Sequence, residues 1–490
     1  MEKKSLLILG TASHVGKSSV VTAICRILSR SYRVAPFKAQ NMSLNSWITK
    51  DGKEIGIAQA IQAKAAGTEP TADMNPVLLK PKGDRVSQVI LLGEPYADKS
   101  AGEYYDSIEE MHAVLKGALE RLWKEHDIIV MEGAGGAAEI NLYERDIVNI
   151  GTARLTQAPI ILVGDIERGG VFASLYGTVA LLPEDVKKNV KGLIINKFRG
   201  DPEILRPGLK QLEEKTGIPV LGVLPYFKLR IPSEDSVSLG DKEASNTENS
   251  KTENEIEIAV IRLPRISNFT DFEPLEGLVK VRYVDIDKEL GNPDAIMIPG
   301  TKNTVNDLLD LRASGMDKKI QAFKGKIPIF GICGGYQMLG RTIFDSGVEN
   351  GVEAEFEGLG LLDIGTRFGA YEKRTIQVTK KVNGHGPILK SIDGEEIKGY
   401  EIHMGVTDSN RAVFGDDGAI DEEGLVIGTY LHGLFDNGNI RNAFVQYLYE
   451  KKGLEYVPEE IVSESDAYDE LASVFEQNID MKKLYEVTGI

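Results

Sequence analysis

Short apolar runs alternate along this chain with longer amphipathic stretches. In the N-terminal half, five runs of six or seven residues lie at positions 5–10, 33–38, 127–132, 159–165 and 192–197. Residues 18–30 and 107–125, which fall between them, have apolar positions at helical spacing. Apolar runs rich in β-branched residues and separated by amphipathic helices predict a parallel, doubly wound sheet.

The C-terminal half repeats this pattern, with apolar runs at residues 257–263, 295–300, 327–333 and 425–433. Between the halves, residues 233–255 (SEDSVSLGDKEASNTENSKTENE) contain almost no large apolar side chains, which is typical of a mobile linker. We therefore predict an α/β protein with two doubly wound domains. Residues 1–232 and 256–452 form the domains, 233–255 the linker, and 453–490 a helical extension.

Composition narrows the possible partners and the location of the protein. The 490 residues include 57 Lys and Arg against 74 Asp and Glu, a net charge of −17, which argues against nucleic acid as a partner. No apolar run approaches the ~20 residues of a membrane helix, so no membrane partner is expected. The two cysteines, Cys25 and Cys333, lack the spacing of a disulfide framework or a zinc site, which suits a cytoplasmic protein.

The first apolar run leads into GTASHVGKS, residues 10–18, and then into a helix. A strand, a glycine-rich turn and a helix N-terminus together form a phosphate-binding loop. Five residues separate the two glycines instead of four, and Thr11 takes the first-glycine position, as in the loop of the dethiobiotin synthetase-like NTPases. We predict that Thr11, Gly16, Lys17 and Ser18 bind ATP, with Lys17 at the β- and γ-phosphates and Ser18 on Mg²⁺. The alternative is a turn that binds nothing.

Glu132 ends the apolar run at residues 127–132. A carboxylate at the C-terminal end of a parallel strand lies beside the phosphate loop. Glu132 is therefore a second candidate for the Mg²⁺ site, directly or through water. Its alternative role is to cap the following turn.

Cys333 lies in KIPIFGICGGYQMLG, residues 326–340, where an apolar strand meets a helix. Small neighbours on both sides allow the sharp turn of a nucleophile elbow, and the helix N-terminus favours a thiolate. A buried structural thiol is the alternative, and the flanking glycines argue against it.

A nucleophilic thiolate also needs an oxyanion site and a base. Gly300, the last residue of the run at 295–300, and Gly334 are candidates for the oxyanion hole and glutamine pocket, and His432 is the candidate base. Class I glutamine amidotransferases usually carry Glu two residues after this histidine, but the chain has Leu434 there. The orienting carboxylate is thus absent or comes from elsewhere, which predicts a glutaminase that is slow by itself. His403 has a structural or a functional role.

The two halves together indicate an ATP-dependent amidation. ATP would convert a carboxylate into an acyl phosphate, and ammonia released from glutamine would displace the phosphate to form an amide. The expected cofactors are therefore ATP and Mg²⁺, with no permanently bound group, and glutamine is one substrate.

Seven segments carry a more specific resemblance, and they lie in both halves: FKAQNMSLNS (37–46), NPVLLKPK (75–82), MEGAG (131–135), DIERGGVFA (165–173), PGTKN (299–303), GICGGYQMLG (331–340) and YEIHMG (400–405). By these segments the whole chain resembles the cobyric acid synthase family of cobalamin biosynthesis. The resemblance implies amidation of the b, d, e and g side chains of adenosylcobyrinic acid a,c-diamide. It also implies Cys333 as nucleophile, His432 as its base, and the loop ending Gly16-Lys17-Ser18 as the ATP site.

A corrinoid that bears carboxylates needs cationic or amide donors in its binding site. The candidates in these segments are Lys38, Gln40, Asn41, Asn45, Lys80 and Arg168. For each lysine or arginine taken singly, the alternative role is that of a solvated surface charge. Four successive amidations of one molecule predict an open, partly solvated pocket.

Three other readings remain open at this point. The related cobyrinic acid a,c-diamide synthases use the same two chemistries on different carboxylates. An amidotransferase could act on another acid, such as a cell-wall precursor. The N-terminal half also resembles partitioning-type ATPases, which are nucleotide-dependent switches, and an intact Cys333 and His432 argue against that reading.

Overall fold

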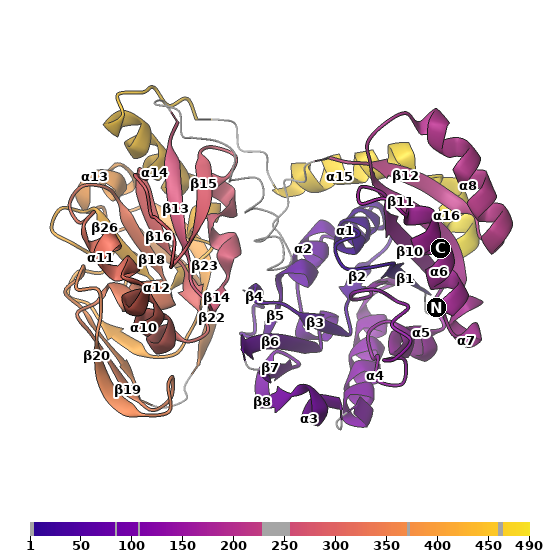
Figure 1. The fold of residues 1–490 in the computed structure, drawn as a ribbon, viewed down its shortest axis with the longest axis horizontal. Helices are drawn as coiled ribbons and strands as arrows, with labels where there is room; N and C mark the ends of the chain where they lie inside the picture. Colours follow the sequence, from indigo (N-terminus) through magenta and orange to yellow (C-terminus); the bar gives the residue numbers. More distant parts are fainter. Residues whose placement is uncertain (1–3, 84–85, 106–107, 228–254, 370–372, 459–463) are drawn as a thin grey trace. The chain divides into compact units, whose positions relative to one another are not determined.

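A computed structural model describes residues 4–83, 86–105, 108–227, 255–369, 373–458 and 464–490 of the chain (Figure 1). These residues form two compact units. Unit 1 consists of the described residues within Met1–Ser43, Lys53–Glu234 and Val462–Ile490, and unit 2 of those within Leu44–Gly52 and Asp235–Ile461. Except for Glu255, the predicted linker at residues 233–255 lies outside the described residues.

The core of unit 1 is a six-stranded parallel sheet in the order β12-β11-β10-β1-β9-β2. The strands are β1 (Lys4–Gly10), β2 (Val34–Phe37), β9 (Ile128–Glu132), β10 (Ile160–Asp165), β11 (Val190–Phe198) and β12 (Val220–Pro225). The five apolar runs of the N-terminal half coincide closely with the first five of these strands, and β12 adds a sixth. Leu7 and Ile8, which are adjacent in β1, are both fully buried, because the sheet is covered on both faces.

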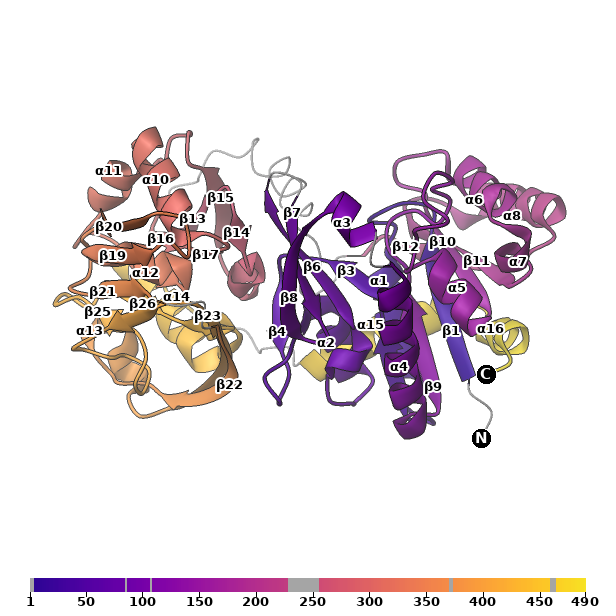
Figure 2. The same ribbon diagram turned by 90° about the horizontal axis from the view of Figure 1, so that it is seen from below.

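Helices lie on both faces of this sheet (Figures 1 and 2). The helices of the N-terminal half are α1 (Lys17–Leu28), α2 (Ile57–Ala65), α3 (Ala101–Tyr105), α4 (Ile108–Glu125), α5 (Ile150–Thr156), α6 (Val171–Leu181), α7 (Glu184–Lys187), α8 (Pro202–Thr216) and the 3-10 helix η1 (Ala72–Met74). A second, smaller sheet of unit 1 has the order β3-β6-β7-β8. Its strands are β3 (Gln40–Met42), β6 (Val77–Gly83), β7 (Val86–Leu91) and β8 (Glu94–Ser100), and the chain also contains β5 (Glu54–Gly56).

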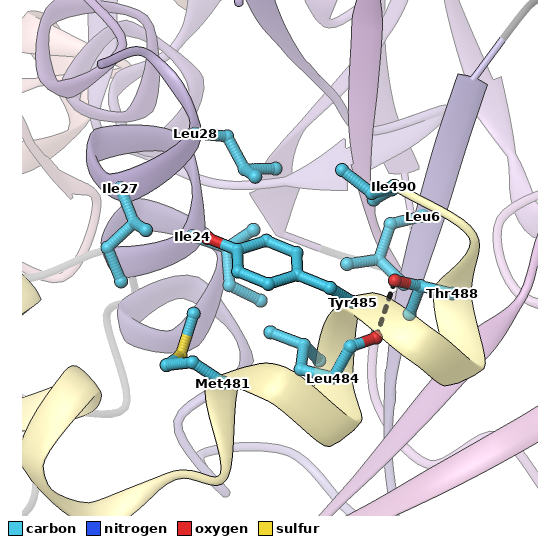
Figure 3. A pocket seen from close by; sticks show the side chains of 9 residues that line it. All are labelled: Leu6, Ile24, Ile27, Leu28, Met481, Leu484, Tyr485, Thr488 and Ile490. Carbon is cyan, nitrogen blue, oxygen red and sulfur yellow. Dashed lines mark hydrogen bonds between the residues drawn. The ribbon is translucent and has the colours of Figure 1, made fainter. Parts of the chain in front are cut away.

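The last two helices of the chain complete unit 1. Helices α15 (Glu464–Asn478) and α16 (Met481–Thr488) lie within the predicted extension at residues 453–490. Helix α15 packs along α1, where Arg26 forms an ion pair with Asp469 at 2.7 Å. Figure 3 shows the apolar pocket between α1 and α16, with Tyr485 pointing into it and Leu484 beside it. The C-terminal residues thus cover part of the core that surrounds the helix after the phosphate loop.

Unit 2 is built on a second six-stranded sheet, in the order β15-β13-β16-β18-β26-β25. All neighbouring strands are parallel except β25, which runs antiparallel to β26. The strands are β13 (Glu257–Arg262), β15 (Lys280–Asp285), β16 (Ala295–Ile298), β18 (Ile329–Ile332), β25 (Ala419–Ile420) and β26 (Val426–Thr429). The apolar runs of the C-terminal half contain β13, β16, β18 and β26. The predicted α/β architecture with two doubly wound domains is therefore confirmed.

Among the described residues, three smaller sheets, which the sequence pattern did not predict, complete unit 2; all their strand pairs are antiparallel except β19 with β21, which is parallel. One has the order β20-β19-β21-β24, one β22-β23-β27, and one pairs β14 with β17. Their strands are β14 (Ile266–Ser267), β17 (Gly300–Thr301), β19 (Thr342–Ser346), β20 (Glu353–Glu357), β21 (Gly365–Phe368), β22 (Arg374–Lys381), β23 (Glu396–His403), β24 (Val406–Asp408) and β27 (Leu431–His432). Strand β4 (Ser46–Ile48) lies against β22 and β23.

The helices of unit 2 are mostly short. They are η2 (Phe269–Leu275), α10 (Thr304–Ser314), α11 (Met316–Gln321), α12 (Gly334–Leu339), α13 (Gly386–Leu389), η3 (Lys390–Ile392), η4 (Leu434–Asp436) and α14 (Gly438–Lys451). Across the described part of the chain, no helix combines the length and hydropathy that a bilayer crossing requires.

Candidate active sites

The glycine-rich loop of unit 1 connects the central strand β1 to α1. Gly16 has a φ of 95°, and a Cβ atom at this position would collide with the side-chain amide of Asn196. That amide donates to the Val15 carbonyl at 2.9 Å and so holds the loop against the end of β11. Only glycine fits this left-handed, crowded position without strain. The connection from β1 to α1 at the carboxyl end of the sheet therefore contains the residues predicted to bind ATP: Thr11, Gly16, Lys17 and Ser18.

Lys17 is folded over this loop. Its Nζ donates to the carbonyl oxygens of Ala12 at 3.0 Å and of Gly135 at 2.9 Å, and the side chain is 7% exposed. This places the Lys17 ammonium group at the N-terminus of α1, where the phosphate oxygens of a nucleotide would bind.

Glu132 lies at the end of β9, beside the loop, and is fully buried. Its Oε1 accepts hydrogen bonds from Ser18 Oγ at 3.0 Å and from Lys38 Nζ at 2.9 Å, and its Oε2 accepts one from Gln62. The structure thus brings together the two residues predicted for the metal, Ser18 and Glu132. A hydroxyl and a carboxylate beside a phosphate loop are the oxygen donors that suit Mg²⁺.

The six candidate residues for the second substrate have different surroundings. Lys38 pairs with Glu132, and Lys80, also buried, pairs with Glu54. Gln40 accepts a hydrogen bond from Tyr104, Asn41 donates one to Gln59, and Arg168 is exposed on the loop after β10. Asn45 is buried and belongs to unit 2, whereas the other five belong to unit 1. The structure therefore does not place all six in one site within unit 1.

In unit 2, Cys333 occupies the turn between β18 and α12. Its backbone has φ 53° and ψ −110°, a conformation that non-glycine residues rarely adopt and that marks a strained nucleophile elbow. A Cβ atom on Gly335 would collide with the Ile298 carbonyl, and one on Gly334 would lie 2.6 Å from Thr301 Cγ2. These glycines allow α12 to start directly against the β16–β17 segment, which carries Gly300.

His432 lies next to this elbow, at the end of β27, and is buried. The side chain of Cys333 is one of the groups that raise the pKa of its imidazole. A Cβ atom on Gly300 would lie 3.3 Å from His432 Cε1. The structure thus brings together the predicted nucleophile, its base and both glycines of the candidate oxyanion site.

A carboxylate that the sequence did not reveal completes this group. Oδ2 of Asp271, in η2, lies 2.7 Å from His432 Nδ1, and its Oδ1 accepts from the Gly433 backbone amide at 2.9 Å. Burial lowers the pKa of His432, but the charge and hydrogen bond of Asp271, with a contribution from Cys333, raise it overall from 6.5 to about 10. Asp271 therefore holds the imidazole in one orientation and stabilises its protonated form.

The other cysteine has a different environment. Cys25 is completely buried on α1, and burial raises the pKa of its thiol above the normal value. It packs in the apolar core around β1, as expected for a structural thiol.

Both units match protein-family models. Residues 6–237 match the CobQ/CobB/MinD/ParA nucleotide binding domain, and residues 257–440 match the CobB/CobQ-like glutamine amidotransferase domain. The chain is 90% identical to "Probable cobyric acid synthase" of Methanosarcina mazei and 91% identical to that of Methanosarcina acetivorans, over the full length of each pair. It is 58% identical to the protein of this name from Methanocella arvoryzae, over 97% of this chain and 96% of the relative.

This chain belongs to the cobyric acid synthase family. The resemblance drawn from the seven sequence segments is therefore confirmed, and so is the prediction of an ATP-dependent glutamine amidotransferase. The roles assigned to individual residues remain predictions, which the geometry now makes specific.

Asp271 is the residue that sequence reasoning missed in this member of the cobyric acid synthase family. The missing glutamate was sought at position 434, two residues after His432. Leu434 occupies that position and is buried. Asp271 lies in NFTDFEPLE, residues 268–276, together with two other acidic residues, Glu273 and Glu276, and no local feature distinguishes the three.

Proposed function

We propose that this chain converts adenosylcobyrinic acid a,c-diamide into cobyric acid by amidating its b, d, e and g carboxylates, with ATP as the energy source and glutamine as the ammonia donor. The observation that carries this proposal is the pair of sites in one chain. Unit 2 holds a strained cysteine with its base and an orienting carboxylate, and unit 1 holds a phosphate loop beside a buried carboxylate. The relatives' name supplies the product, cobyric acid, and the resemblance to their family supplies the substrate.

The residues of unit 2 support hydrolysis of glutamine. The Cys333 thiolate attacks the side-chain amide carbon, and backbone N–H groups near Gly300 and Gly334 stabilise the oxyanion. Protonated His432 gives its proton to the departing nitrogen, which leaves as ammonia. His432 then takes a proton from water, which cleaves the thioester and releases glutamate. Asp271 keeps the imidazole oriented through both steps.

The residues of unit 1 support activation of a carboxylate. An oxygen of the corrinoid carboxylate attacks the γ-phosphorus of ATP, ADP leaves, and ammonia then displaces phosphate from the acyl phosphate. Lys17 would stabilise the charge that develops on the phosphate oxygens. Ser18 and Glu132 would hold Mg²⁺, which neutralises phosphate charge when bound. No other bound cofactor is required, and a location in the cytoplasm would supply ATP and glutamine.

Cationic and amide donors of unit 1 would bind the carboxylates and amides of the corrinoid. Lys38, Gln40, Asn41, Lys80 and Arg168 remain the candidate contacts of the corrinoid in unit 1. The buried ion pairs of Lys38 and Lys80 indicate that these two would act with Glu132 and Glu54 as partners, not as free cations. Asn45 remains a candidate only if the corrinoid reaches residues of unit 2.

The decisive experiment is mass spectrometry of adenosylcobyrinic acid a,c-diamide incubated with the protein, ATP, Mg²⁺ and glutamine. Stepwise conversion of up to four carboxylates into amides is the expected result. Conversion of cobyrinic acid instead would assign the chain to the a,c-diamide synthases. Turnover of ATP and glutamine with neither corrinoid changed would point to another acid, and ATP turnover alone to a nucleotide-dependent switch.

A further inference from the structure

A short segment from the N-terminal half belongs to unit 2. The chain leaves unit 1 after Ser43 and returns to it at Lys53, and residues 44–52 between them, which include β4, pack with unit 2. Strand β4 lies against β22 and β23. The 44–52 segment is therefore a part of the glutaminase structure that the domain pattern of the sequence did not predict.

The backbone of one residue in this segment holds two side chains of unit 2. The Ser46 carbonyl accepts a hydrogen bond from Tyr400 Oη at 2.9 Å, and the Ser46 amide donates one to Asn268 Oδ1 at 3.2 Å. Ser46, Tyr400 and Asn268 are all buried. Water therefore does not compete for these bonds, and losing one would leave a buried polar group without its partner.

Both of these side chains adjoin His432. The Tyr400 ring stacks on the imidazole, with the ring centroids 5.2 Å apart and an interplanar angle of 19°. The Asn268 side-chain nitrogen lies 3.4 Å from each imidazole nitrogen. The Asn268 carbonyl also accepts from the backbone amide of Asp271 at 3.1 Å. Asn268 thus contacts both the base and the turn that carries its orienting carboxylate.

The 44–52 segment also packs on the strand that reaches the nucleophile. The Ile402 carbonyl of β23 lies 3.5 Å from Cys333 Sγ, which donates to it. Ile48 of β4 forms a small buried cluster with Tyr400 and Ile402. The Trp47 ring lies 5.4 Å from the Tyr400 ring. Strand β23 therefore contacts β4 and also both reacting residues, Cys333 and His432.

We propose that the 44–52 segment is a built-in positioning element of the glutaminase, and that Tyr400 and Asn268 are the positioning residues through which it fixes the His432 imidazole. The proposal rests on the glutaminase reaction proposed above. An imidazole that must meet both Cys333 and Asp271 tolerates little rotation, so a stacked ring anchored by its hydroxyl restricts it to the productive orientation. Neither residue forms or breaks a bond in the reaction.

The first test is Tyr400→Phe, which keeps the stacked ring and removes the hydrogen bond to Ser46. The expected result is a fall of about tenfold in kcat for glutamine hydrolysis, the size of one buried hydrogen bond. KM for glutamine and amidation driven by added ammonia should stay within about twofold. An unchanged KM also reports that unit 2 remains folded.

Tyr449→Phe is the matched control. It removes another phenol-to-carbonyl hydrogen bond of unit 2, the one from Tyr449 to Leu278 at 3.4 Å. This bond involves none of Cys333, His432 and Asp271, so the variant should keep the kcat of the original protein.

A second variant, Asn268→Gly, tests the other positioning residue. Asn268 has a φ of 51°, which glycine adopts without strain, so the substitution removes the amide and preserves the turn. It should also lower kcat, and the double variant should lose less than the product of the two single losses, since both residues act through His432.

Two results would overturn the inference. One is a kcat for both single variants within about twofold of the original protein. The other is an equal loss of glutamine-driven and ammonia-driven amidation, which would indicate general structural damage. If the unaltered protein hydrolyses no glutamine, the proposed function itself fails, which is a separate outcome.

Discussion

His432 and Asp271 are 161 positions apart in the chain, and their side chains meet at 2.7 Å in the interior of unit 2. The contact supplies the third member of a Cys-His-carboxylate group from a turn that precedes the nucleophile. In this chain η2 therefore contributes what the residue two positions after the histidine usually contributes in class I glutamine amidotransferases.

Asp271→Asn should damage glutamine hydrolysis without affecting use of ammonia. The amide would not stabilise the imidazolium and would favour the wrong tautomer, so kcat for glutamine should fall by about 10³- to 10⁴-fold. Steady-state assays with glutamine and with ammonium salts would measure both activities. An Asp271→Asn protein that hydrolyses glutamine at the original rate would show that Asp271 has only a structural role.

The same pair predicts how stability changes with pH. Since the pKa of His432 is raised to about 10 in the folded protein and is about 6.5 in an unfolded chain, its stabilisation is fully present below about pH 6.5. Between about pH 6.5 and pH 10 the imidazole is protonated in the folded protein but not in the unfolded chain, so the free energy of unfolding falls as pH rises. Thermal unfolding across this range should show a smaller fall for Asp271→Asn. Parallel curves for the two proteins would contradict the raised pKa.

Cys333→Ala and Lys17→Ala should separate the two reactions. Removing the nucleophile should abolish amidation with glutamine and leave amidation with ammonia largely intact. Removing the loop lysine should abolish both, because both need the acyl phosphate. Amide formation followed by mass spectrometry with each nitrogen source distinguishes these outcomes. Loss of ammonia-driven amidation in a folded Cys333→Ala protein would contradict this division of labour.

Lys38→Met should destabilise unit 1, because it removes the cation that pairs with the buried Glu132 carboxylate at 2.9 Å. The expected loss is on the order of 3 kcal/mol of unfolding free energy, which chemical denaturation would measure. Lys187→Met is the matched control, since Lys187 pairs with Glu184 at 3.2 Å on the surface and should contribute little. Equal stabilities for the two variants would mean that the Lys38–Glu132 pair contributes no more than a surface pair.

The C-terminal helix should contribute to the stability of unit 1. Leu484 is 3% exposed and packs with the core cluster around α1, so Leu484→Ala should cost about 2–5 kcal/mol. Lys482→Ala, on the exposed side of the same helix, should change stability by less than about 0.5 kcal/mol. Denaturant unfolding of both variants would measure the difference. Similar losses of unfolding free energy for the two variants would show that α16 does not stabilise the core of unit 1.

The phosphate loop and the cysteine elbow could be predicted from sequence because each is local. In both, a strand, a glycine-rich turn and a helix follow one another without interruption, so the whole pattern can be read within one short segment. The parallel sheets were predictable for a similar reason, since strands buried on both faces are apolar along their whole length. In the smaller sheets of unit 2, strands such as β20 and β22 have mostly exposed or half-buried side chains, so their apolar pattern is weaker.

Tertiary structure alone decided the remaining features. It brought Asp271 to His432, Lys38 to Glu132, and residues 44–52 to β23. It also placed α15 against α1. Each of these contacts joins residues that are far apart in sequence, and each depends on which elements become neighbours in the folded chain. A carboxylate or a tyrosine carries no local sign of its future partner, whereas a strand, a glycine-rich turn and a helix in direct succession are recognisable because all three adjoin in the chain.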